Sequence, residues 1–325
     1  MSQLINIENI HEVKEFAFKN NELFILTNRY IKFGGIEIKG EFRCITFWED
    51  YLLYQNLKGN NIIIYNPLEQ RVIKVINGAR EYGLWFLDKY GKIPVDDKVM
   101  SLNPFLELIE TNSVFSTCSN GIYNFNRFKN SVKCTYVSIG EIKWILELGE
   151  GVKVNGDFYL FNQIIVVPIS NNGIVGINIE TGKELWRLAN INANSFQIQP
   201  KTNYLISLDS NSIGDNWYYV ISPTNGQIIV DKKFDCFYYG AGGSQACIDD
   251  NHYYFISNTM GFPKEMRTEK ITHLGCINLQ THEIEWMNKI GTTSDKKIEY
   301  QKLEVHDGKI YLLDEEKTLH IYKIE

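Results

Sequence analysis

The feature of this sequence that most limits its fold is a phrase that occurs more than once. Residues 177–186 (INIETGKELW) return 100 residues later as 277–286 (INLQTHEIEW), and a weaker copy lies 44 residues after the first, at 221–230. Each copy reads as a strand, a tight turn and a second strand. Recurrence at this interval indicates a repeat architecture, in which each repeat is one small supersecondary unit.

The segment 151–190 shows the whole unit. Apolar runs at 158–161 and 164–167 precede the two strands of the phrase, 173–179 and 183–187. The turn between these last two strands contains Gly182, as a tight hairpin needs a residue that accepts positive φ. Aromatic residues make up 13% of the chain, and Ile, Val and Thr are abundant, which favours strands over helices. The segment therefore predicts a four-stranded antiparallel sheet.

The same template fits most of the chain, so we expect an all-β fold, a single β-propeller over residues 1–325. We expect seven blades of four antiparallel strands, with six or eight as alternatives because 79–104 and 140–150 fit the template poorly. The last blade has three strands of its own, and Leu4–Ile7 is expected to supply the fourth, which would protect its edge. The expected blades cover approximately 13–40, 42–78, 83–148, 151–190, 196–235, 245–291, and 299–325 with 3–9.

The phrase from Asn178 to Trp186 resembles the repeat of the quinoprotein-like (PQQ-like) β-propellers. In that family an Asp-x-x-Thr-Gly turn follows strand C, and strand D carries a docking Trp. The copies depart from this pattern at His282, which replaces Gly, and at Val230, which replaces Trp. The motif is structural, and the family includes both cofactor-binding dehydrogenases and scaffolds without a cofactor, so the resemblance does not decide function.

A catalytic member of this family would imply bound Ca²⁺, a catalytic carboxylate, a vicinal disulfide and export. The six cysteines of this chain include no adjacent pair, and no calcium-loop pattern is present. The N-terminus lacks the basic and apolar regions of a signal peptide, and no apolar run is long enough for a membrane span. We therefore expect a cytoplasmic, non-catalytic member with no cofactor, no bound metal and no membrane contact.

Other chemical signals in the sequence are weak. The histidines at 273, 282, 306 and 320 do not have the spacing of a zinc site, and Asp249-Asp250 and Glu315-Glu316 are expected in solvated turns. The glycine-rich segment 240–244 lacks the Lys of a P-loop and is expected to connect two blades. The net charge of −6, with no basic block, argues against nucleic acid as a partner.

The long connections of the expected propeller share one face. The segments 81–104, 234–245 and 291–297 join successive blades, and 209–216 and 258–270 join the middle strands of two blades; all emerge on the same side. Long connections are often functional, and aromatic, Met and Arg side chains dominate protein interfaces. The candidate partner-binding residues are Trp85, Phe86, Tyr90, Trp217, Phe237, Tyr238, Tyr239, Met260, Phe262, Met266 and Arg267.

These observations predict a monomeric, non-enzymatic protein that binds another protein through this face. The acidic chain favours a basic partner, and the narrower hypothesis is an immunity protein that neutralises a bacterial toxin domain. Two alternatives remain open: a quinoprotein-like enzyme or small-molecule binder that uses the central channel, and a carbohydrate-binding propeller with Trp or Tyr platforms.

Overall fold

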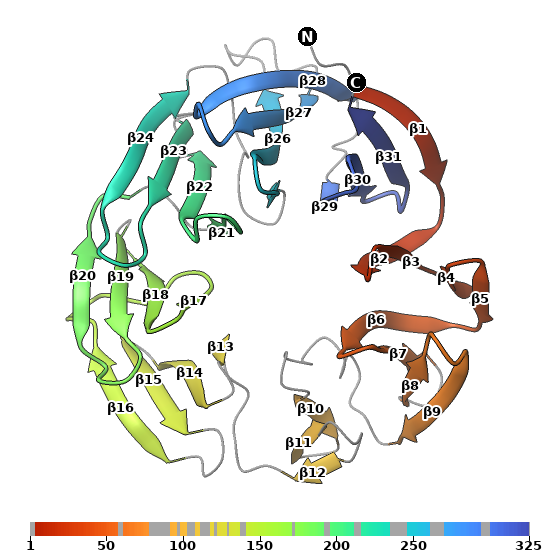
Figure 1. The fold of residues 1–325 in the computed structure, drawn as a ribbon, viewed down its shortest axis with the longest axis horizontal. Coiled ribbons are helices and arrows are strands. Elements are labelled where there is room, and N and C mark those ends of the chain that lie inside the picture. The colour runs from red at the N-terminus through yellow and green to blue at the C-terminus, as the bar shows by residue number, and fades with distance from the viewer. Residues whose placement is uncertain are drawn as a thin grey trace. The chain divides into compact units, whose positions relative to one another are not determined.

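In the described part of the chain, the computed structural model contains strands, turns and connections, and its four-stranded sheets are antiparallel (Figure 1). Among the described residues, no helix is long and apolar enough to span a bilayer. The structure describes residues 4–57, 61–77, 92–95, 98–102, 108–110, 118–119, 122–128, 130–136, 141–170, 173–191, 196–210, 216–234, 246–260, 270–293 and 300–324.

The chain divides into two units, which are treated separately. One unit contains residues 10–124 and 135–141, and the other contains residues 1–9, 125–134 and 142–325.

The first unit contains two four-stranded sheets and one three-stranded sheet. The first sheet is β2 (Val13–Lys19), β3 (Glu22–Thr27), β4 (Tyr30–Phe33) and β5 (Ile36–Lys39). The second is β6 (Phe42–Trp48), β7 (Tyr51–Asn56), β8 (Ile62–Asn66) and β9 (Arg71–Ile76). The third is β10 (Lys92–Val95), β11 (Lys98–Leu102) and β12 (Leu108–Glu110). Phe24, Phe33 and Phe42 belong to one buried cluster shared by the first two sheets, so apolar packing joins them.

Another four-stranded sheet follows β10–β12 along the chain. Its strands are β13 (Cys118–Ser119), β14 (Tyr123–Phe128), β15 (Ser131–Tyr136) and β16 (Ile142–Glu147). We expected one blade over residues 83–148, and this expectation is wrong, because β10–β12 form a separate sheet before β13. No copy of the repeated phrase marks residues 92–110, so the sequence offered no boundary between the two sheets.

The second unit contains four further four-stranded sheets. Two of them are β17 (Tyr159–Phe161), β18 (Ile164–Ile169), β19 (Gly173–Asn178) and β20 (Glu184–Leu188), followed by β21 (Gln197–Ile198), β22 (Leu205–Ser210), β23 (Asn216–Ile221) and β24 (Ile228–Phe234). The others are β25 (Ala246–Ile248), β26 (His252–Met260), β27 (Lys270–Asn278) and β28 (Glu283–Thr293), and then β29 (Tyr300–His306), β30 (Lys309–Asp314) and β31 (Leu319–Ile324) with β1 (Leu4–Ile10). Shared buried clusters join each of these sheets to the next.

Strand β1 completes the last sheet, whose order is β1-β31-β30-β29. The sequence predicted this pairing, and the structure confirms it. The contact extends to side chains: the Nδ1 atom of His320 lies 2.9 Å from the Oδ1 atom of Asn9, and Leu4 packs against the apolar cluster of this sheet. The described residues thus form the seven four-stranded antiparallel sheets expected of the propeller, together with the three-stranded sheet.

The repeated phrase folds into the same turn in each copy. The amide of Gly182 donates to the carbonyl of Asn178 at 2.9 Å, that of Gly226 to Ser222 at 3.0 Å, and that of His282 to Asn278 at 2.8 Å. The last residue of each turn has positive φ, at 68°, 70° and 58° respectively. The turn therefore needs a left-handed residue, which Gly provides without steric cost.

Two of these turns are each covered by the indole ring of a Trp residue from the preceding sheet. The Nε1 atom of Trp144 donates to the carbonyl of Ile179 at 2.8 Å, and that of Trp186 donates to the carbonyl of Pro223 at 3.0 Å. A Cβ atom placed on Gly182 would come within 2.6 Å of the Trp144 ring, and one on Gly226 within 2.7 Å of the Trp186 ring. The turn glycine thus serves two purposes: it accepts positive φ, and it leaves room for the ring from the preceding sheet.

The two departures from the repeat compensate for each other. Val230 stands at the strand position of Trp186, and His282 stands at the turn position of Gly226. Because valine places no ring over this turn, a side chain fits there, and the Nδ1 atom of His282 lies 3.1 Å from the hydroxyl of Tyr218. Burial, followed by the charge of Lys232, lowers the pKa of His282, so the neutral imidazole is favoured.

Candidate functional site

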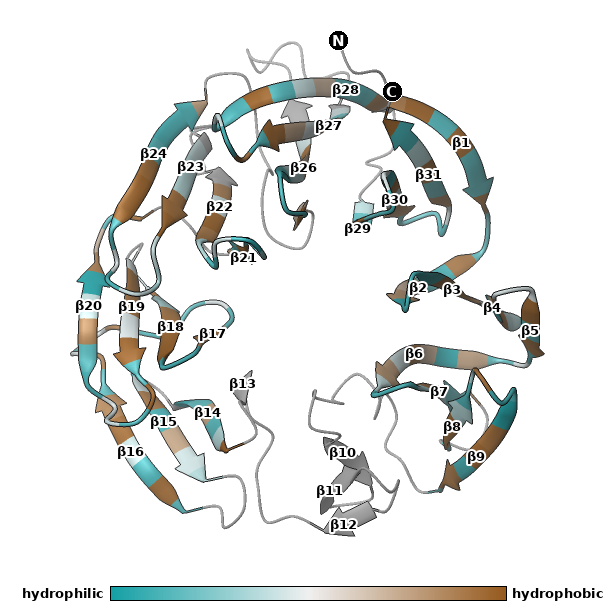
Figure 2. Ribbon diagram, viewed as in Figure 1, coloured by the Kyte–Doolittle hydropathy of each residue, from teal (hydrophilic) through white to brown (hydrophobic). Residues whose placement is uncertain are grey.

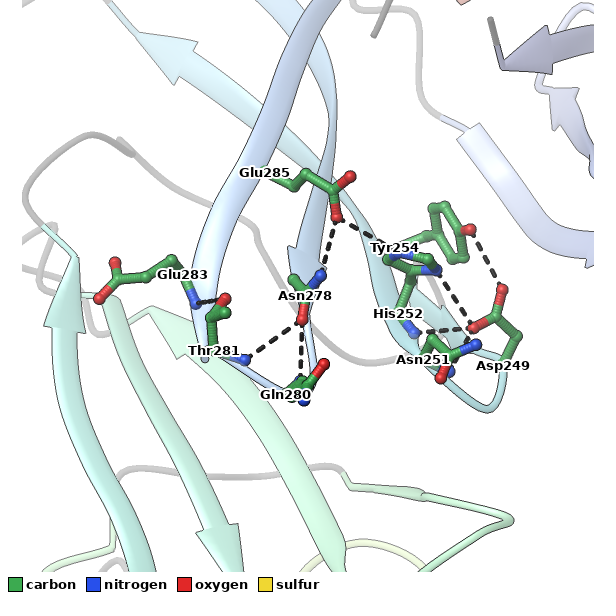
Figure 3. Close-up of polar contacts among 9 residues, drawn as sticks. All are labelled: Asp249, Asn251, His252, Tyr254, Asn278, Gln280, Thr281, Glu283 and Glu285. Carbon is green, nitrogen blue, oxygen red and sulfur yellow. Dashed lines mark hydrogen bonds and ion pairs between the residues drawn. The ribbon is translucent and has the colours of Figure 1, made fainter. Parts of the chain in front are cut away.

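A group of ionisable side chains lies on sheet β25–β28 (Figure 3). Asp249 follows β25 and closes the turn into β26. Its Oδ1 atom accepts the backbone N–H groups of Asn251 at 2.8 Å and His252 at 2.7 Å, and its Oδ2 atom accepts the hydroxyl of Tyr254 at 3.1 Å. These three hydrogen bonds fix the carboxylate in one orientation.

The imidazole of His252 lies between two carboxylates. Its Nδ1 atom is 3.5 Å from Oδ1 of Asp249, and its Nε2 atom is 3.2 Å from Oε2 of Glu285. Oε2 of Glu285 also accepts the side-chain amide of Asn278 at 3.2 Å (Figure 3). Each nitrogen of the ring therefore faces a carboxylate whose position is held by a further hydrogen bond.

A buried thiol completes the cluster. Cys276 is 1% exposed, and one ligand atom each from His252, Cys276 and Glu285 lie within 4.8 Å of one another. Burial, and then the negative charges of Glu285 and Asp249, raise the pKa of the Cys276 thiol. Imidazole, thiol and carboxylate groups at this separation are the donors that could hold a metal ion.

A β-bulge in β28 directs Glu285 to this place. Cys276 pairs with Trp286 and Ile277 pairs with Ile284, so Glu285 is the extra residue and has no partner on β27. A bulge re-aims the side chain of its extra residue. Here it sets the carboxylate of Glu285 beside the ring of His252, whose own strand is two strands away.

This cluster was not predicted from the sequence. Asp249 was predicted in a turn, which is confirmed, but the turn was expected to be solvated, whereas the carboxylate accepts three hydrogen bonds. The histidines at 273, 282, 306 and 320 were assessed by their spacing, and His252, which gains its neighbours from two other strands, was not among them. The signal was present in the repeat, because Glu285 stands where the first copy has Leu185.

The predicted partner-binding residues are mostly outside the described part of the chain. Nine of the eleven lie there: Trp85, Phe86, Tyr90, Phe237, Tyr238, Tyr239, Phe262, Met266 and Arg267. Met260 is the last residue of β26 and pairs with Lys270. The glycine-rich segment 240–244 also lies outside the described residues.

Trp217 is the candidate whose side chain is described. It is half-buried on β23, and its ring stacks on that of Tyr219, with 6.1 Å between centroids and 11° between planes. It also packs against the apolar cluster shared by sheets β17–β20 and β21–β24. Trp217 therefore contributes to packing between these sheets and remains partly exposed.

The comparisons with known proteins support the fold. BamB from Moraxella catarrhalis is similar to this chain with a TM-score of 0.52 and 10% identity, over 99% of this chain and 100% of that one. The computationally designed Ika8 protein is similar with a TM-score of 0.59 and 13% identity, over 98% of each chain. No family model matches the chain, and no curated protein matches it.

The chain has the β-propeller fold. The seven four-stranded antiparallel sheets and the similarity to BamB agree on this assignment. At these identities the similarity concerns the fold alone, and the function is argued from the residues of this chain.

Proposed function

We propose that this chain is a non-enzymatic binding protein whose ligand is another protein. The observation that carries the proposal is the exposure of aliphatic side chains on the outer strands of successive sheets. Ile142 and Ile145 on β16 are 52% and 48% exposed, Leu185 on β20 is 48% exposed, and Ile229 on β24 is 43% exposed. Contiguous exposed apolar side chains are typical of interaction surfaces, and we propose that these outer strands together form one such surface.

The position of these side chains adds to the argument. Strands β16, β20 and β24 are each the last strand of their sheet, so one edge of their backbone is not paired within that sheet. Each of these strands carries both hydrophobic and hydrophilic residues (Figure 2). The charged residues include Lys143 on β16, Glu184 on β20 and Asp231 on β24. A strand edge with apolar anchors and a charged surround is suited to an extended segment or an edge strand of a partner protein.

The predicted long-connection face supplies a second part of the proposed surface. Its described member, Trp217, offers a partly exposed indole held in place by Tyr219. Indole rings that are already ordered lose little conformational entropy on binding and act as anchors in interfaces.

The proposed partner is basic, because the chain carries a net charge of −6 and would attract a cationic surface. The narrower proposal is that the protein is a cytoplasmic, monomeric immunity protein that covers the active site of a bacterial toxin domain. It rests on analogy with other degenerate propellers and on the acidic charge, and it needs its own test.

The proposal is tested with the full chain as bait against lysate and culture medium of its source. The captured protein is identified, purified and titrated with the chain by calorimetry. We expect the double variant Leu185→Asp, Ile229→Asp to weaken binding at least about tenfold, because each buried aliphatic side chain contributes on the order of 1–2 kcal/mol. The exposed turn residue Leu68 gives the matched control, and Leu68→Asp should leave the affinity within about twofold.

A second variant tests the long-connection face. Phe262→Asp with Met266→Asp should weaken binding and leave the melting temperature nearly unchanged, because both residues are predicted to face the partner. If the captured protein binds both double variants as tightly as the original chain, or if no protein is captured, the proposed function is wrong. The immunity proposal requires in addition that one equivalent of the chain abolish the toxic activity of the captured protein.

A further inference from the structure

The side chains of the cluster on β26, β27 and β28 differ in chemistry from those at the corresponding positions of other sheets. We propose that His252, Cys276 and Glu285 form a binding site for a divalent transition-metal ion of the zinc class. The ligand atoms are the Nε2 atom of His252, the Sγ atom of Cys276 and a carboxylate oxygen of Glu285. This site is independent of the proposed binding function.

The spacing of the ligand atoms fits such an ion. In a tetrahedral site with metal–nitrogen and metal–oxygen bonds of about 2.0–2.1 Å, neighbouring ligand atoms lie about 3.3 Å apart. The Nε2 atom of His252 and the Oε2 atom of Glu285 are 3.2 Å apart. The three ligand atoms lie within 4.8 Å of one another, so small side-chain rotations bring the thiol to bonding distance.

Groups behind the ligands hold them in place. The Nδ1 atom of His252 faces Asp249, and the carboxylate of Asp249 is fixed by two backbone amides and the hydroxyl of Tyr254. A carboxylate behind the second ring nitrogen keeps the proton on Nδ1 and directs the lone pair of Nε2 to the metal. The amide of Asn278 orients Glu285 in the same way.

The strand pairing shows that the cluster is not part of the common repeat. The row Cys247–Tyr254–Cys276–Trp286 across sheet β25–β28 corresponds to Tyr159–Val166–Gly176–Trp186 across sheet β17–β20. From these rows, the positions of Asp249, His252, Cys276 and Glu285 can be matched in other sheets. They are Phe161, Ile164, Gly176 and Leu185 in β17–β20, Gln199, Tyr204, Val220 and Ile229 in β21–β24, and Trp48, Tyr51, Ile64 and Ile73 in β6–β9.

None of these matched residues carries an imidazole, a thiol or a carboxylate. These three sheets form with apolar or neutral side chains at the four positions. The sheet structure therefore does not require the side chains of Asp249, His252, Cys276 and Glu285. In sheet β25–β28, by contrast, all four positions carry side chains that can bind a metal ion or orient a metal ligand. Metal binding requires such a set of side chains, whereas formation of the sheet does not.

The donor set selects the class of metal. A thiolate and an imidazole favour zinc-class transition metals over Ca²⁺ and Mg²⁺, which prefer oxygen ligands. Three protein ligands leave the fourth position of a tetrahedral ion for water or for a group of a bound partner. His252 and Glu285 are partly exposed, so this position is reached from solvent.

The test uses the full chain, freed of metal with a chelator and kept reduced. We expect one equivalent of Co²⁺ to bind and to produce the charge-transfer absorption of a cobalt–thiolate bond, and Zn²⁺ to displace it. Zinc should also raise the melting temperature, because it binds the folded chain. Glu285→Gln should weaken binding at least about tenfold, and its exposed position means that it does not disturb the core.

Control variants distinguish Co²⁺ binding by this cluster from Co²⁺ binding elsewhere on the chain. Cys276→Ser should abolish the charge-transfer band, whereas Cys247→Ser and Glu283→Gln, which change neighbours outside the cluster, should retain the band. If the folded chain binds no Co²⁺ to saturation, if the band persists in Cys276→Ser, or if Glu285→Gln binds as the original chain does, the proposed site is wrong.

Discussion

Replacing Trp186 with Ala should lower the free energy of unfolding by about 3 kcal/mol. Its ring lies against two glycines: a Cβ atom on Gly176 would come within 2.2 Å of it, and one on Gly226 within 2.7 Å. Its Nε1–H group also donates to the carbonyl of Pro223. The substitution removes this hydrogen bond and opens a cavity beside two residues that have no side chain to fill it.

The measurement is equilibrium unfolding in urea, with the neighbouring Leu185→Ala as control. Leu185 lies on the same strand and is 48% exposed, so its replacement should cost less than about 1 kcal/mol. A loss below about 1 kcal/mol for Trp186→Ala would mean that the indole does not hold the Pro223–Gly226 turn.

Removing residues 1–10 should cost at least about 3 kcal/mol, because it deletes strand β1. Most side chains of β1 are exposed, so its contribution comes mainly from the backbone hydrogen bonds to β31, at about 0.5–1.5 kcal/mol each, and from Leu4. The deletion also leaves β31 as an unprotected edge strand, which promotes association between chains. Unfolding curves and light scattering of the truncated chain measure both effects.

A synthetic peptide of residues 1–12 provides the control for this truncation. Added in excess, it should restore stability by pairing with β31, whereas a scrambled peptide of the same composition should not. If the truncated chain is as stable and as monomeric as the full chain, β1 has no structural role.

The sequence predicted those parts of the fold that the repeat marks. The turn at Asn178–Gly182 follows from a residue pattern that needs positive φ, and the pairing of β1 with β31 follows from a last blade that is one strand short. Residues 92–110 carry no copy of the phrase, so the sheet β10–β12 could not be separated from the blade that follows it. The sequence showed Val230 in place of Trp and His282 in place of Gly as separate departures from the repeat. The structure relates them, because Trp186 of one sheet covers the turn at Gly226 of the next, and Val230 and His282 stand at the corresponding two positions.

The cluster around His252 was harder to predict for a physical reason. Its ligands are separated by 24 and 9 residues in the chain, and they meet because strand pairing aligns β26 with β27 and a bulge turns Glu285 toward them. Motif searches depend on short spacing along the chain, whereas register and bulges are properties of the paired sheet. An alignment of the repeats to one another, rather than a search for motifs, would have shown Glu285 among aliphatic residues.

The pairing of β1 with β31 defines the last blade of the propeller. Hydrogen–deuterium exchange of the full chain, resolved to residues 4–10, tests it most directly. We predict that the amides of this segment that face β31 are protected for as long as those of β30 in the same sheet. Exchange of residues 4–10 at the rate of an unstructured peptide, with β30 protected, would contradict the claim.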